Sequence, residues 1–161
     1  MTGSAILHNR RTALASFGLG ALAVMALPGA AQAGVAEMES ALNELIGPAR
    51  STARTGRITI DLPALAESGN SVPLKVSVQS PMTEADHVKR ILVFADRNPR
   101  ALIIDVTLGP RAGRAEVGTN IRLSGTQNVS AYAQMSDGYY WSATRSIQVT
   151  IGACDSLLLR F

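Results

Sequence analysis

The chain has 161 residues, of which 47% are apolar, 17% are charged and only 4% are aromatic. This length suits one globular domain better than two, because domains usually have ~100–150 residues, and the apolar fraction is too high for a disordered chain. The formal net charge is +3, only two of the basic residues are lysines, and the sequence has no basic run, so binding along a nucleic-acid backbone is disfavoured.

Residues 1–33 have the pattern of an export signal. Arg10 and Arg11 precede an apolar segment, residues 13–27, and a small-residue cleavage pattern follows at residues 31–33. The arginine pair is typical of the twin-arginine type. A retained membrane anchor is the alternative, but glycine and proline interrupt a segment that would need ~20 continuous apolar residues to span a bilayer. We therefore expect a mature chain that begins at Gly34 and works in the periplasm.

The first part of the mature chain has helical periodicity. Apolar residues recur at Val35, Met38, Leu42 and Ile46, which predicts a short amphipathic helix over residues 34–46. The dipeptide Gly47-Pro48 ends it. Residues 34–56 are thus expected to form an N-terminal helix and a polar linker.

Beyond residue 56 the period changes from 3.6 to 2, which indicates strands. Most segments alternate apolar and polar residues, whereas residues 88–95 and 102–108 are more continuously apolar, as in strands buried on both faces. The expected strands are residues 58–62, 72–78, 88–95, 102–108, 115–123, 129–135 and 147–151.

Turn residues separate these segments, and Asp137-Gly138 is a strong hairpin signal. About seven short strands with regular turns predict an all-β fold, an immunoglobulin-like antiparallel sandwich over residues 57–151. The Cys–Trp–Cys pattern of antibody domains is absent from the sequence, so the likeness to them is one of architecture.

Few residues of the sequence suit catalysis. His87 follows Glu84 and Asp86, but these three do not have a recognised metal-ligand spacing, and no cofactor motif is present. A nucleophilic Cys–His pair would require the side chains of His87 and Cys154 to lie close together in the fold. The five aromatic residues that we considered as ligand contacts are more often part of a core or an interface: Phe94, Tyr132, Tyr139, Tyr140 and Trp141. We expect neither a metal nor a cofactor.

The single cysteine, Cys154, is the eighth residue from the end of the sequence, in Gly152-Ala153-Cys154-Asp155-Ser156. An odd cysteine in an exported protein suggests intermolecular pairing or a working thiol. Small residues before it and its position near the chain end predict a thiol on a short C-terminal arm, residues 152–161. The alternative is a buried structural cysteine, which is common for free thiols.

Several segments, in this order, resemble the SoxY family of sulfur carriers of the periplasmic thiosulfate-oxidising Sox system. The similarity covers most of residues 56–154, and the paired-arginine signal agrees with it. The matching segments are residues 69–73, 78–83, 93–99, 113–117, 126–129 and 135–138.

This resemblance implies an immunoglobulin-like carrier that forms a heterodimer with SoxZ and is not itself an enzyme. It implies that Cys154, by its position, holds the sulfur substrate covalently. Three partner enzymes would act on the adduct: a c-type cytochrome that joins thiosulfate to the thiol, a hydrolase that releases sulfate, and a dehydrogenase that oxidises the remaining sulfane sulfur.

The C-terminal segment departs from the family's Gly-Gly-Cys-Gly-Gly pattern. Ala153, Asp155 and Ser156 replace three glycines, and five further residues, Leu157-Leu158-Leu159-Arg160-Phe161, follow. Asp155 should disfavour the thiolate and repel an anionic substrate, and the apolar end could obstruct partner pockets or reflect a frameshift. Three hypotheses follow: a sulfur carrier, a binding module that pairs with SoxZ but has lost carrier chemistry, and a purely structural sandwich.

Overall fold

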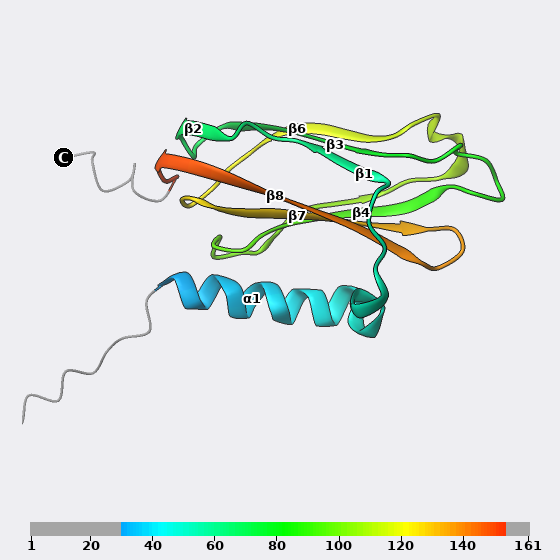
Figure 1. Ribbon diagram of the computed structural model, residues 1–161, viewed down its shortest axis with the longest axis horizontal. Coiled ribbons are helices and arrows are strands. Elements are labelled where there is room, and N and C mark those ends of the chain that lie inside the picture. Colours follow the sequence, from blue (N-terminus) through cyan, green and yellow to red (C-terminus); the bar gives the residue numbers. More distant parts are fainter. Residues whose placement is uncertain (1–29, 154–161) are drawn as a thin grey trace, which may run out of the picture.

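Alternating apolar and polar side chains build two sheets that pack face to face in the computed structural model, which describes residues 30–153 (Figure 1). One sheet has the strand order β1-β3-β6 and the other β2-β8-β7-β4-β5. The strands are β1 (Ile58–Asp61), β2 (Leu65–Ser68), β3 (Val72–Val78), β4 (Val88–Ala95), β5 (Leu102–Thr107), β6 (Ala115–Ile121), β7 (Gln127–Met135) and β8 (Tyr140–Ile151).

The core lies between the two sheets. In β3 the burial of successive residues alternates, and Val72, Val76 and Leu74 are buried against the larger sheet. The facing side chains include Ile91, Val93, Val129 and Ile147. Burial of a side chain of this size contributes about 1.5–3 kcal/mol, so the period-2 pattern accounts for the packing of the sandwich.

A helix, α1 (Ala30–Leu45), covers part of the outer face of the five-stranded sheet (Figure 1). Leu42 and Ile46 pack in a second apolar cluster with Phe94 and Tyr132, whose rings meet edge to face with centroids 5.9 Å apart. Val35, which the periodicity placed on the packed side, is 49% exposed. Two 3-10 helices complete the fold: η1 (Gly47–Thr52) directly follows α1, and η2 (Pro110–Ala112) lies between β5 and β6.

The all-β class, the immunoglobulin-like sandwich and the N-terminal helix are confirmed, with eight strands rather than about seven. The missed strand is β2, which pairs with β8 in parallel, so the sandwich is not wholly antiparallel. β2 has four residues and lies at a sheet edge, and none of its side chains is fully buried. With neither face of β2 fully covered, the strand has no alternation of buried and exposed residues that the sequence could reveal.

Two other expectations about strands need correction. β5 was expected to be buried on both faces, but its residues are half-buried or exposed because it is an edge strand. β8 begins at Tyr140, seven residues before the expected start, because it pairs with β7 directly from the hairpin. The turn itself is as predicted, with Gly138 at φ 88° and its N–H donating to the carbonyl of Met135.

Within residues 30–153, no helix is long and apolar enough to cross a membrane. The predicted export signal lies outside the described residues up to position 29, and residues 30–33 belong to α1.

The ion pair formed by Arg90 on β4 and Asp105 on β5 is expected to make the stability of the fold weakly dependent on pH. The guanidinium donates two hydrogen bonds, at 2.8 and 2.6 Å, and these bonds lower the pKa of Asp105. A carboxyl group with a lowered pKa stabilises the fold above its unfolded pKa, and that stability is lost as the pH falls through the folded pKa. We expect Arg90→Gln to reduce the free energy of unfolding by less than about 1 kcal/mol at pH 7, since the pair is partly exposed.

Urea unfolding at pH 7 and pH 3 tests this expectation. The difference between the variant and the parent should shrink at pH 3, and the matched change Lys89→Gln, at an exposed neighbouring position, should have no pH-dependent effect. An Arg90→Gln effect that grew as the pH fell would contradict the assignment.

Candidate functional site

The backbone around the end of β8 is held at one end of the sandwich, at the left of Figure 1. The N–H of Gly69 donates to the carbonyl of Ile151 (2.7 Å), the N–H of Leu123 to the carbonyl of Gly69 (2.8 Å), and the N–H of Ala153 to the carbonyl of Leu123 (2.9 Å). We call residues 151–153 with these partners the arm root. Three hydrogen bonds join the ends of both sheets and hold the chain just before Cys154.

Gly69 is packed too closely for any side chain. A Cβ at this position would lie 2.0 Å from the carbonyl oxygen of Leu123 and 3.0 Å from the nitrogen of Ala153. Both neighbours are backbone atoms in hydrogen bonds, so neither can rotate away. The sequence indicated only a turn at Ser68-Gly69-Asn70, because a close approach of three distant segments leaves no local pattern.

The predicted site residue Cys154 lies outside the described residues, as do Asp155 and the apolar end at residues 157–161. Cys154 follows Ala153 directly, so its Cα is about 3.8 Å from that of Ala153 by peptide geometry alone. Gly152, the first residue of the expected arm, is buried. The described part of that arm is therefore anchored to the sandwich.

A buried asparagine, Asn98, fixes the loops next to the arm root. It is 8% exposed. Its Nδ2 donates to the carbonyl of Arg122 (2.9 Å), and its Oδ1 accepts from the N–H of Ser124 (3.0 Å) and from Nε2 of Gln127 (3.1 Å). Asn98 thus joins the turn after β4 to the segment after β6 that contains Leu123. The sequence suggested only a turn at Asn98-Pro99.

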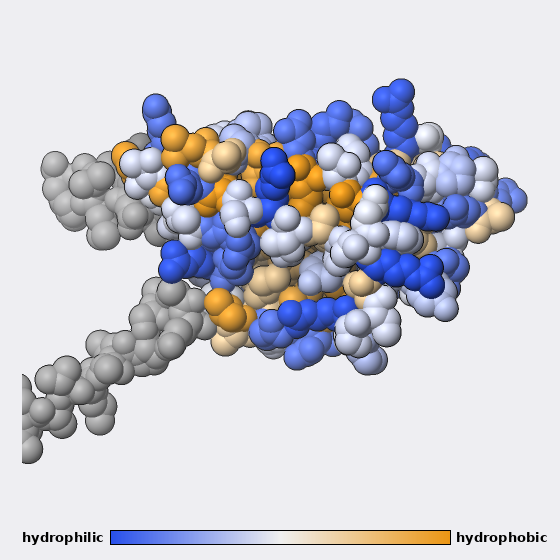
Figure 2. Space-filling view, viewed as in Figure 1, coloured by the Kyte–Doolittle hydropathy of each residue, from blue (hydrophilic) through white to orange (hydrophobic). Residues whose placement is uncertain are grey.

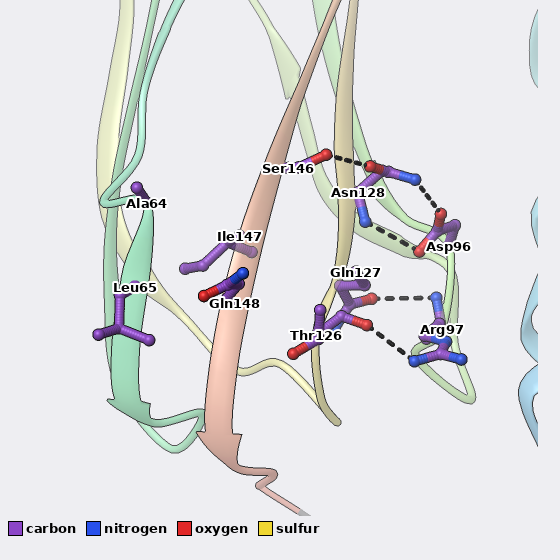
Figure 3. A pocket seen from close by; sticks show the side chains of 10 residues that line it. All are labelled: Ala64, Leu65, Asp96, Arg97, Thr126, Gln127, Asn128, Ser146, Ile147 and Gln148. Atoms are coloured by element: carbon purple, nitrogen blue, oxygen red, sulfur yellow. Dashed lines mark hydrogen bonds between the residues drawn. The ribbon is translucent and has the colours of Figure 1, made fainter.

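A hollow of about 630 Å³ lies where β2, β8 and the start of β7 meet the turn after β4 (Figure 3). Asp96 accepts hydrogen bonds from the backbone and side chain of Asn128, and Asn128 accepts one from Ser146. Arg97 donates to Thr126 through Nη1. Because these polar groups hydrogen-bond to one another, they hold one side of the hollow in place, whereas Ala64, Leu65 and Ile147 add apolar lining.

Apolar side chains are also exposed beside the arm root. Leu65 of β2 is 58% exposed and Ile151 of β8 is 43% exposed. Figure 2 shows apolar surface gathered at this end of the molecule, over β2. The strands β2 and β8 that carry these two side chains pair with each other, so both add exposed apolar surface at the same sheet edge.

The structure separates His87 from the arm root. His87 precedes β4, whereas Asn98 follows it, and eight residues of strand at about 3.3 Å each put the two at opposite ends of the sheet. The ring Nδ1 of His87 is 3.0 Å from the carbonyl of Thr83. The described residues therefore give no support for a pair with Cys154, which follows the arm root in the sequence.

The other candidate residues have structural positions. Among residues 30–153 no three His, Cys, Asp or Glu side chains are close enough together to hold a metal ion. Phe94, Tyr132 and Tyr140 are buried beneath α1. Tyr139 and Trp141 lie under the guanidinium groups of Arg54 and Arg57, respectively.

We expect Asn98→Ala to lower the free energy of unfolding by about 3 kcal/mol, since it leaves buried partners without hydrogen bonds. Asn120→Ala, at an exposed position of β6, is the matched control and should change stability by less than about 0.5 kcal/mol. Chemical denaturation measures both. Equal effects of the two changes would show that Asn98 does not hold these loops.

Residues 42–154 match the family described as sulfur oxidation protein SoxY. Among solved structures, the sulfur carrier protein SoxY from Chlorobium limicola f. thiosulfatophilum matches with a TM-score of 0.57 and 24% identity, over 72% of this chain and 98% of that one. A search of curated proteins found no match.

The fold also occurs in superoxide reductases. A superoxide reductase (neelaredoxin) from Ignicoccus hospitalis matches with a TM-score of 0.54 and 20% identity, over 64% of this chain and 87% of that one. Similarity at this level of identity shows a shared sandwich fold and carries no information about activity.

Proposed function

The chain belongs to the SoxY family of sulfur oxidation proteins, and from this premise we propose that it carries sulfur intermediates covalently on Cys154 in the periplasm. The observation that supports the proposal is the anchored arm root, because the chain's single cysteine is the next residue after it in the sequence. A carrier needs a thiol that leaves the body of the protein at a defined place and can still enter another protein.

The chemistry of loading explains why such a carrier needs partners. Joining thiosulfate to a thiol forms an S–S bond and releases one proton and two electrons, so an electron acceptor is required. A c-type cytochrome would supply this step. Water would then release sulfate through a partner hydrolase, and a sulfane dehydrogenase would oxidise the remaining sulfur. In this scheme the chain is a non-catalytic subunit.

We propose a heterodimer with a SoxZ-like subunit as the working form. The exposed apolar side chains Leu65 and Ile151 offer contact surface beside the arm root. The proposed organisation is an export signal at residues 1–33, a helix and linker at 34–56, the sandwich at 57–151 and the cysteine-bearing arm at 152–161.

A second candidate function is a binding module that keeps the SoxZ-like partner but has lost carrier chemistry. It is favoured by the sequence after the arm root, where Asp155 puts a negative charge beside the thiol and residues 157–161 add an apolar end. The two candidates differ in one observable, the presence of sulfur on Cys154.

Intact-mass measurement of the exported protein from cells grown on thiosulfate tests the proposal, with and without reductant. A carrier should show a mass gain that reductant removes and that maps to the peptide containing Cys154. A full-length, unmodified mass under the same conditions would favour the binding module. A mass that lacks residues 157–161 would show that the apolar end is processed.

A further inference from the structure

Two arginines line a second hollow next to the arm root. This hollow, of about 480 Å³, opens between the edge strands β5 and β6, one from each sheet. Arg100, just before β5, and Arg122, just after β6, are the charged side chains among its described lining residues, which include no carboxylate. A concave site with two cations and no acid is suited to a small anion.

The backbone beneath both arginines is fixed. Asn98 donates to the carbonyl of Arg122, and Pro99 directly precedes Arg100. Both side chains are exposed, and neither takes part in the four ion pairs found within residues 34–153. The two guanidinium groups therefore present their N–H donors to solvent from a rigid support.

The hollow lies beside the end of the described chain. Arg122 is the neighbour of Leu123, whose carbonyl holds the N–H of Ala153 at 2.9 Å. Cys154 is the next residue, about 3.8 Å further along the chain from Cα to Cα. Because Arg122 directly precedes Leu123, the hollow borders the last described residue before Cys154.

We propose that Arg100 and Arg122 form a binding site for the sulfonate end of the sulfur chain carried on Cys154. The inference rests on the proposed carrier function and names its substrate contacts. Guanidinium groups bind oxyanions through charge-assisted hydrogen bonds, often two at a time. The positive charge also opposes the repulsion that Asp155 exerts on an incoming anion. Thiosulfate can therefore be joined to Cys154 despite the divergent sequence of the arm.

Reaction with tetrathionate tests the site without partner enzymes. The thiolate attacks a sulfur of the central S–S bond, Cys154 gains an S–S–sulfonate group, and thiosulfate leaves with the electron pair. Methyl methanethiosulfonate is the neutral comparison: the thiolate takes its S-methyl group and methanesulfinate leaves. The ratio of the two second-order rates, followed by intact mass, cancels any change in thiol pKa or exposure.

We expect the double change Arg100→Gln and Arg122→Gln to lower the tetrathionate rate about threefold to tenfold at low salt while leaving the neutral rate unchanged. The difference should shrink at high salt, where charges are screened. Arg111→Gln, in η2 at the far end of the sandwich, is the matched control and should leave the ratio unaltered.

Each other result counts against the site. An unchanged rate ratio in the double variant, with normal thiosulfate loading in cells, would overturn the anion site and leave the carrier function standing. Weaker binding of a partner protein with an unchanged ratio would reassign the arginines to protein docking. A thiol that reacts with neither reagent in the folded protein would contradict the carrier function and this inference together.

Discussion

Replacing Cys154 with serine is expected to abolish the reductant-labile adduct and thiosulfate-dependent growth, while the protein stays folded. The chain has no other cysteine that could take over the attachment. A serine hydroxyl has nearly the same size but is not ionised at neutral pH, so it does not form a stable bond to sulfane sulfur. Intact mass and oxygen consumption on thiosulfate measure the two effects.

Ser156→Ala, two residues beyond the thiol, is the matched control and should keep both the adduct and the activity. The melting temperature of all three proteins should agree, because neither change replaces a residue that makes the hydrogen bonds of the arm root. Growth of the Cys154→Ser strain at the parental rate would show that the chain supports sulfur oxidation without a thiol, as the binding-module function requires.

Gly69→Ala is expected to destabilise the fold strongly at the arm root. The new Cβ would lie 2.0 Å from the carbonyl oxygen of Leu123, so the backbone must shift and the three hydrogen bonds there must weaken. Overpacking against side chains typically costs 1–3 kcal/mol, and a rigid backbone contact puts this change at about 3 kcal/mol. Chemical denaturation measures the loss.

Gly125→Ala is the matched control, since Gly125 also lies near the arm root but a Cβ there meets nothing within 4 Å. It should change stability by less than about 1 kcal/mol. Amide hydrogen exchange adds a local readout: the N–H of Ala153 should exchange faster in Gly69→Ala than in Gly125→Ala. Equal exchange at Ala153 would contradict the role of Gly69 as the anchor.

The anchored root changes how the divergent arm is understood. With Gly152 buried and Ala153 hydrogen-bonded, the residue that replaces a family glycine at position 153 takes part in the anchor through its backbone. Alanine is compatible with that role. The departures that bear on chemistry are therefore those after the thiol, Asp155 and residues 157–161. The hollow lined by Arg100 and Arg122 supplies positive charge that would oppose the charge of Asp155.

The sequence alone determined the features that depend on local patterns. Alternation gave β1, β3, β6 and β7 close to their observed bounds, and Asp137-Gly138 located the hairpin, because a strand between a core and solvent imprints its period on the chain. The lone cysteine near the end, with the ordered family segments, led to Cys154 as the candidate site and to the family, which the match over residues 42–154 confirms. The role of Cys154 itself stays a prediction.

The tertiary structure alone decided which distant segments meet. Nothing local distinguishes Gly69 or Asn98 from an ordinary turn residue, since their partners lie 24 or more positions away at Arg122, Leu123 and Ile151. The parallel pairing of β2 with β8 and the edge position of β5 likewise depend on strand order, which alternation does not encode. Side-chain period reports burial, whereas the site is made by backbone contacts between loops, and those exist only once both sheets have closed.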